Sequence, residues 1–428
     1  MDGKYFIVNE YRSHIHLFTH NARLFLFAMA LLAFGTAPSS LFLNLYFDKI
    51  GLNREFIGWV NTVIQIGGAV AILPAALLLD RIGRPAAILV GGYTATIAWA
   101  IAVLMPSSNF ILPLLFINGA GIGLFGLAVV PLLAESSSQT ERTTLFSVSE
   151  GTTTLALFVG SVLSGYVPLW LAPLLGAPHE SAEVYRAILL ISAVIRLIGM
   201  LPLTLIRHTA TPAQTGSAAL LPTTAKQVRF ASFFNLRNLV RLKTPILLLG
   251  IPILIVFFAG SLIFPFLSLF IKDRFGASDS VIGTVLGLLN LSIGAGSLIA
   301  PIAVNAIGRG PVIVGGALAS ALALAVIGFT PVFVLAAGLI ILRAGLFNMI
   351  IPLYRAYVID SAPAEEYTIV ALLLSLCANI GPAIGPILSG RIQLQYGFGP
   401  AFILAIIGYA VAALIYGLIL VKRRKHAL

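Results

Sequence analysis

The chain has 428 residues, of which 59% are hydrophobic and only 10% are charged, and its mean hydropathy is +1.02. This composition lies far outside the range of soluble globular domains. A net charge of +11 would indicate a nucleic-acid partner in a soluble protein. Here the basic residues flank long apolar runs, so we expect a lipid bilayer as the partner and no nucleic acid.

Long apolar runs between polar breaks predict membrane-spanning helices along the whole chain. The first six are expected at 22–46, 56–79, 85–105, 110–133, 145–171 and 185–206. The second six are expected at 245–270, 281–304, 312–329, 332–358, 367–390 and 398–421. The runs do not alternate polar with apolar residues, so a β-barrel is excluded. The predicted fold class is therefore an all-α membrane protein with twelve transmembrane helices.

The polar breaks divide the chain into five predicted parts. These are a lead-in at 1–21, a six-helix bundle at 22–207, a linker at 208–243, a second bundle at 244–421 and a basic tail at 422–428. If the N-terminus is cytoplasmic, most of the 26 Lys and Arg fall on cytoplasmic segments. This bias predicts a multi-pass protein of the plasma (inner) membrane with both termini in the cytoplasm.

The linker changes composition along its length. It begins with Thr, Ala, Pro, Gln, Gly and Ser, and then becomes basic, with Phe230, Phe233 and Phe234 among the charges. We expect a flexible segment followed by an amphipathic helix on the cytoplasmic membrane surface. The alternative is a disordered linker whose basic residues only contribute to the excess of positive charge on the cytoplasmic side.

The two halves of the sequence repeat each other without a gap. Positions 225 residues apart carry matching residues: Gly51 and Gly276, Gly83-Arg84 and Gly308-Arg309, Glu135 and Asp360. Chance similarity between apolar helices would not keep one register over such a length. Because each repeat contains an even number of spans, both copies face the same way, which predicts two bundles related by an axis along the membrane normal.

A charged motif follows the second span and reads Asp80-Arg81-Ile82-Gly83-Arg84. It resembles the cytoplasmic signature of the major facilitator superfamily. Gly83 permits a tight turn, and the charged side chains can bond to neighbouring helix ends. Alternatively, the motif only connects two helices and its arginines only orient the protein in the membrane. That interpretation does not explain Asp80.

This resemblance implies a twelve-helix fold of two pseudo-symmetric six-helix bundles with alternating access around a central site. It also implies a cytoplasmic gating network that holds the outward-facing state. The network is expected to comprise Asp80, Arg81, Gly83, Arg84, Glu135, Arg142, Gly308, Arg309 and Asp360.

Ionisable side chains within the spans are candidates for function, because they cost about 2.5 to 3.5 kcal/mol at a helix centre on insertion scales. Arg343 in the tenth span is a candidate for substrate binding or coupling, with a structural salt bridge as the alternative. Glu150 in the fifth span is the acid placed to carry a proton, or else it is a structural partner for Arg142 or for a loop. Arg196 in the sixth span fits a structural role better.

In the resembled family, spans one, four, seven and ten line the cavity. Uncharged polar residues on these spans are therefore expected substrate contacts: Thr36, Asn44, Asn118, Ser261 and Asn348.

The first functional hypothesis is a secondary transporter that exports a small amphiphilic compound against proton entry. The second is uptake or facilitated transport of a small anionic or polar metabolite, such as a sugar or organic anion. The reason is that the candidates within the spans include two arginines and only one acid. A non-transporting sensor or scramblase is a remote third. We expect a monomer with no enzymatic activity, no cofactor and no metal, since the sequence contains neither an ATP-binding loop nor a metal-ligand cluster.

Overall fold

The computed structural model describes residues 18–135, 142–206, 244–363 and 366–424. The expected amphipathic linker helix, most of the N-terminal lead-in and most of the basic tail lie outside these residues.

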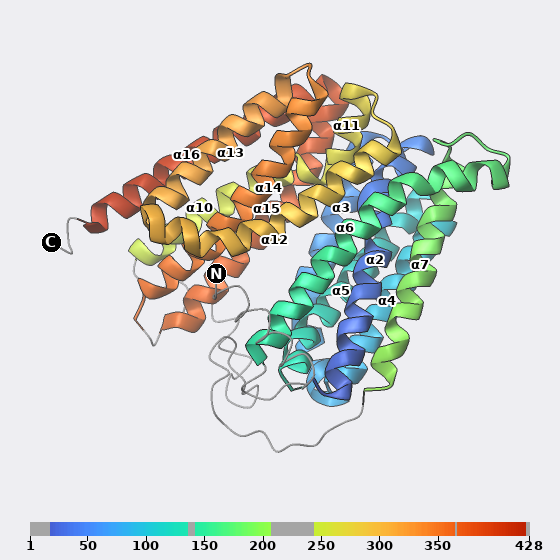
Figure 1. Ribbon diagram of the computed structural model, residues 1–428, viewed down its shortest axis with the longest axis horizontal. Helices are drawn as coiled ribbons and strands as arrows, with labels where there is room; N and C mark the ends of the chain where they lie inside the picture. Colours follow the sequence, from blue (N-terminus) through green and yellow to red (C-terminus); the bar gives the residue numbers. More distant parts are fainter. Residues whose placement is uncertain (1–17, 136–141, 207–243, 364–365, 425–428) are drawn as a thin grey trace, which may run out of the picture. The chain divides into compact units, whose positions relative to one another are not determined.

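Helices make up almost the whole of the described chain (Figure 1). The first half contains α2 (His20–Lys49), α3 (Arg54–Ile82), α4 (Arg84–Leu104), α5 (Ser108–Glu135), α6 (Arg142–Leu175) and α7 (Ala182–Thr204). The second half contains α10 (Thr244–Ser261), η1 (Phe264–Phe266), α11 (Leu267–Phe275), α12 (Asp279–Ile307), α13 (Arg309–Phe329), α14 (Phe333–Asp360), α15 (Tyr367–Tyr396) and α16 (Phe398–Arg424). Within the described residues, twelve helical segments are long and apolar enough to cross a membrane. The predicted fold class is confirmed.

The seventh span differs from its prediction as one continuous helix at 245–270. The α10 helix ends at Ser261, the short 3-10 turn η1 follows, and α11 begins at Leu267. Pro265 lies in the middle of η1 and has no N–H to donate to a helical ladder. The segment therefore keeps the hydropathy of a spanning helix but is broken near its far end.

Contacts within the chain divide it into two compact units. The first unit holds α2, α4 to α7, most of α3, most of α11 and the first half of α12. In it α2 packs against α6 and α7, and α4 packs against α5 and α7. The second unit holds α10, η1, α13 to α16, the rest of α12 and residues Arg54–Gly58 of α3. In it α10 packs against α15 and α16, and α13 packs against α14 and α16.

The sequence repeat reappears as a repeated helix contact, once in each unit. In the first unit Gly283 of α12 lies against the carbonyl of Ser161 in α6, where an added Cβ would come 2.5 Å from the oxygen. In the second unit Gly58 of α3 lies against the carbonyl of Pro386 in α15, again too close for a Cβ. Both glycines and both contacted residues are 225 positions apart, so the internal repeat holds at the level of packing.

Glycines also set the spacing of α4 and α5. A Cβ on Gly121 of α5 would come 2.6 Å from both the Ala95 nitrogen and the Gly91 oxygen of α4. Such backbone contact is the packing mode that small residues allow between membrane helices. Gly126, five positions further along α5, has nothing within 4 Å of its added Cβ.

Replacing Gly121 by Ala should therefore destabilise the protein by about 1 to 3 kcal/mol, because α4 and α5 must separate to admit the methyl group. The matched variant Gly126→Ala should change stability by less than about 1 kcal/mol. Thermal unfolding in detergent, followed by tryptophan fluorescence, checks both. Equal effects of the two variants would contradict the packing described.

Candidate functional site

The charged loop after α3 forms the turn and one of the ion pairs that its sequence predicts. Gly83 has a φ of 78°, a backbone conformation that favours glycine. Arg84 at the start of α4 forms an ion pair with Glu135 at the end of α5. Neither Asp80 nor Arg81 has a hydrogen bond or ion pair in the described part of the chain, and both are exposed.

The second half repeats this arrangement. Gly308 has a φ of 85°, and Arg309 Nη1 donates to Asp360 Oδ2 at 2.8 Å. We call Arg84–Glu135 and Arg309–Asp360 the loop pairs. Each is partly exposed, with side-chain exposures of 30% and 54% in the first and 39% and 63% in the second. Exposed pairs contribute about 1 kcal/mol or less, so the loop pairs can break at little cost.

Arg142, the remaining member of the expected network, forms no ion pair with a described residue but bonds to the residue next to Glu135. Its Nη2 donates to the Ala134 carbonyl at 3.4 Å, and its Nε is buried without a partner. Arg142 forms no ion pair with Glu150, in the part of the chain described, so that alternative for Glu150 gains no support.

Glu150 lies on α6 about two turns from its first residue. Its side chain is exposed and has neither a hydrogen bond nor an ion pair to a described residue.

Most of the uncharged candidates bond to the backbone. Thr36 donates to Leu32 O at 2.7 Å and Asn348 to Ala344 O at 3.0 Å, both one turn back in their own helices. Asn118, a buried residue, donates to Ala95 O of α4 at 2.8 Å. These bonds satisfy polar groups within the helix packing.

Asn44 and Ser261 join helices. Asn44 accepts from Asn61 Nδ2 of α3 at 3.2 Å. The Ser261 hydroxyl lies 2.7 Å from the Phe258 carbonyl and 3.1 Å from the Gly381 carbonyl of α15. Ser261 thereby fixes the end of α10, immediately before the break in the seventh span.

Arg196 and Arg343, the arginines singled out near the middle of their spans, are buried against aromatic rings. Arg196 of α7, which is 9% exposed, has its guanidinium carbon 5.4 Å from the centroid of Trp99. Its stem fills the space opposite Gly35 of α2, where a Cβ would come 2.8 Å from the arginine Cγ. This packing supports the structural role expected for Arg196.

Arg343 of α14 is only 1% exposed. Its guanidinium carbon lies 4.2 Å from the ring centroid of Phe264, 4.6 Å from Tyr409 and 5.9 Å from Phe347. We call these four residues the Arg343 cage; all belong to the second unit. Nε and Nη2 of Arg343 have no hydrogen-bond partner, and no carboxylate of the described residues lies within ion-pair distance.

A buried charge cluster that sequence reasoning missed lies in the first unit. Asp279, the first residue of α12, is 5% exposed and accepts hydrogen bonds from the Tyr185 hydroxyl at 2.9 and 3.1 Å. Lys272 Nζ of α11 bonds to Asp279 Oδ1 at 2.8 Å and also pairs with Glu180. The sequence signals were an acid opening an apolar helix and a lysine one element earlier. Nothing in the sequence shows that they meet a tyrosine of α7.

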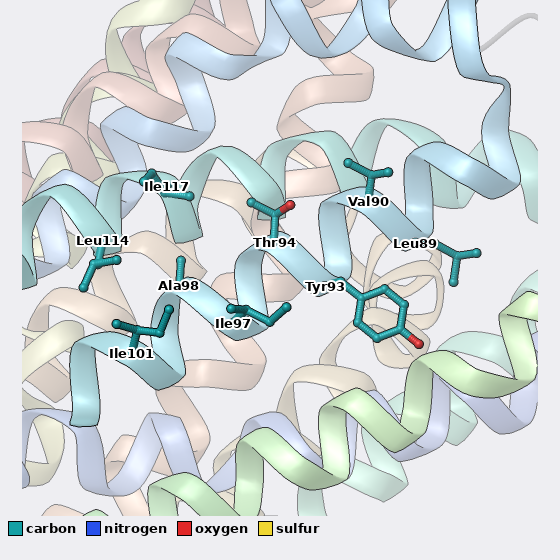
Figure 2. A pocket seen from close by; sticks show the side chains of 9 residues that line it. All are labelled: Leu89, Val90, Tyr93, Thr94, Ile97, Ala98, Ile101, Leu114 and Ile117. Atoms are coloured by element: carbon teal, nitrogen blue, oxygen red, sulfur yellow. The ribbon is translucent and has the colours of Figure 1, made fainter. Parts of the chain in front are cut away.

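An apolar groove of about 530 Å³ runs along α4 and α5. Figure 2 shows that the hydroxyls of Tyr93 and Thr94 are the only polar side-chain groups among its lining residues. It contains none of the candidate residues. Within the described ranges, no three His, Cys, Asp or Glu side chains are grouped to hold a metal ion.

The buried and the exposed ion pairs predict losses of stability of different size. Asp279→Asn should destabilise the protein by about 3 kcal/mol, because it removes the more buried of the two carboxylates that compensate a mostly buried lysine. Asp360→Asn, the same change in an exposed loop pair, should cost less than about 1 kcal/mol. Thermal unfolding of the two variants in detergent provides the comparison, and an Asp279→Asn protein as stable as Asp360→Asn would refute the buried pair.

Comparison with known proteins supports the fold. The sequence profile of the Major Facilitator Superfamily matches residues 24–264 and 249–428. Two Mycobacterium tuberculosis sequences, from strains CDC 1551 and H37Rv, are each 28% identical to this chain over 169 residues and are described as uncharacterized MFS-type transporters. The matched segment covers 38% of this chain and 40% of the length of those relatives.

Solved structures of transporters share the architecture along most of the chain. The nucleoside transporter NupG matches with a TM-score of 0.72 and 15% identity, over 94% of this chain and 99% of NupG. A bacterial homolog of the human lysosomal transporter Spinster matches with a TM-score of 0.72 and 17% identity, over 96% of this chain and 97% of that one. At such identities the likeness concerns the fold alone. With the profile match over both halves, it shows that this chain belongs to the major facilitator superfamily.

Proposed function

We propose that this protein is a secondary transporter that moves a small amphiphilic compound across the membrane by alternating access. The observation that carries this proposal is the loop pair, which occurs once in each half after a positive-φ glycine. Two copies of a weak, breakable ion pair at equivalent helix ends suit a device that alternates between states of similar energy.

The family supports this reading, as do the names of the fold neighbours, which describe a nucleoside transporter and a homolog of a lysosomal transporter. The expected setting is the plasma membrane, with both termini cytoplasmic and the protein acting as a monomer. A non-transporting sensor or scramblase would have no use for loop pairs in both halves.

We assign proton coupling to Glu150 and export as the direction. A charged carboxylate inside a span is costly, and Glu150 has no partner among the described residues, so the proposed scheme has it bind a proton on one side and release it on the other. In this scheme, proton entry through Glu150 drives the compound outward.

A second candidate function is transport of a small anionic or polar metabolite. The observation that favours it is Arg343, a buried guanidinium with no carboxylate partner among the described residues. The two candidates differ in the amphiphilic character of the cargo and in the need for Glu150.

In proteoliposomes, addition of a transported compound should produce a substrate-dependent pH change, and Glu150→Gln should abolish it because an amide cannot carry the proton. The measurement is the signal of an entrapped pH dye, screened against cationic and neutral drugs, sugars and organic anions.

The control is Glu183→Gln, which removes an exposed acid at the start of α7 and should leave the pH change intact. Substrate flux without a pH change, unaffected by Glu150→Gln, would remove Glu150 from the mechanism and favour facilitated transport. Absence of flux for all compounds would favour the non-transporting alternative.

A charge exchange tests the loop pair. Arg84→Glu places two acids together and should lower the rate of transport about fivefold, the effect of about 1 kcal/mol on the balance between states. The double variant Arg84→Glu with Glu135→Arg should restore the rate, because the attraction returns with its sign reversed. If the double variant is as slow as the single one, the ion pair itself has no part in the cycle.

A further inference from the structure

Within the described residues, the guanidinium at the centre of the Arg343 cage lacks the counter-charge and part of the hydrogen bonding that a buried charge requires. The guanidinium is fully buried, its Nε and Nη2 donors have no partner, and no described carboxylate neutralises it. The three aromatic faces attract the positive charge but accept none of these in-plane N–H bonds as an oxygen would. A buried charge in this condition is expensive, so it persists where a partner arrives in another state.

The Asp279 cluster shows that this fold can satisfy a buried charge when it has the residues to do so. Lys272 has two carboxylates, and Asp279 has a lysine and a tyrosine hydroxyl. Arg343 has no comparable set, although it lies about 15 Å along α14 from Phe333, deep within its span.

The cover over Arg343 comes from the broken part of the seventh span. Phe264, the nearest ring, is the first residue of η1, the 3-10 turn that separates α10 from α11. A three-residue turn with Pro265 at its centre has fewer backbone bonds to lose than a helix. Displacing η1 therefore uncovers Arg343 more readily than moving α14 or α16 would.

The donors of Arg343 define the ligand. A guanidinium presents a planar fork of N–H groups that matches the paired oxygens of a carboxylate, sulfonate or phosphate. Phe264, Phe347 and Tyr409 offer flat apolar surfaces beside the fork for an aromatic body. A cationic amphiphile would meet like charge at the same place.

We propose that the Arg343 cage is a binding site for amphiphilic anions, with the acidic head on the Arg343 fork and a flat apolar body against the three rings. This inference rests on the proposed transport of an amphiphilic compound and names its charge. It replaces the alternative of a structural salt bridge for Arg343.

The test uses p-toluenesulfonate, which stays ionised, and its neutral counterpart p-toluenesulfonamide. The sulfonate should raise the thermal unfolding temperature of the purified full-length protein, and the sulfonamide should not. Arg343→Gln should weaken sulfonate binding at least about tenfold, while Arg355→Gln, the same change three turns further along α14, should alter it less than about twofold.

Arg343→Lys keeps the charge but loses the planar fork, so its affinity should fall between those of the wild type and Arg343→Gln. Equal stabilisation of the wild type by the sulfonate and the sulfonamide would overturn the proposal, as would unchanged binding in Arg343→Gln. If Arg343→Gln does not fold, the proposal is still tested by the preference of the wild type for the sulfonate over the sulfonamide and by the affinity of Arg343→Lys for the sulfonate.

Failure of this inference is distinguishable from failure of the proposed function. Proton-linked flux of other compounds without Arg343-dependent binding of the sulfonate would overturn the anion site alone. Binding of the sulfonate that depends on Arg343, without flux of any compound, would overturn transport and support the anion site.

Discussion

Every backbone N–H and C=O within a bilayer must be hydrogen-bonded inside the protein, and this constraint shapes all the rest of the structure. It makes the apolar runs helical. Because the backbone bonds are then used within the helices, the spans differ from one another through their side chains. Where helices approach closely, glycine gives the space, as Gly283 does against α6 and Gly58 against α15. These two contacts involve positions 225 residues apart, so the repeat in the sequence is also a repeat in helix packing.

The same constraint makes charge informative. Two solutions to a buried charge occur in this chain. Asp279 and Lys272 compensate each other and are bonded further to Tyr185 and Glu180. Arg343 is surrounded by rings that stabilise its charge and leave two of its donors unbonded. The first arrangement suits a fixed structural element, and the second suits a group that waits for a ligand.

Much of this could be predicted from the sequence, because hydropathy and register are local properties. All twelve predicted spans fall on helices, and the positions 225 apart predicted that Gly83 and Gly308 would form equivalent turns. Glu135 was expected in the charged network because it ends the fourth span, and it forms an ion pair with Arg84. Asp80 and Arg81 were expected in the same network and have no partner within the described ranges.

Other features depend on tertiary contacts that no local pattern encodes. The break at η1 lies within a run as apolar as an intact helix, so hydropathy predicted one span through it. The meeting of Asp279 with Tyr185, 94 positions away, is a tertiary contact between α7 and the first residue of α12. The lack of a carboxylate partner for Arg343 among the described residues is likewise a property of the packed second unit, since the sequence allowed a structural salt bridge there.

The measurement that tests the central claim of alternating access most directly is counterflow in proteoliposomes. Vesicles are preloaded with an excess of unlabelled compound, chosen because the purified protein binds it, and a trace of labelled compound is added outside. A carrier whose site faces one side at a time should accumulate label transiently above its equilibrium level, as outward movement of the unlabelled compound returns the site. Label that rises only to equilibrium, at a rate independent of the preload, would contradict the account.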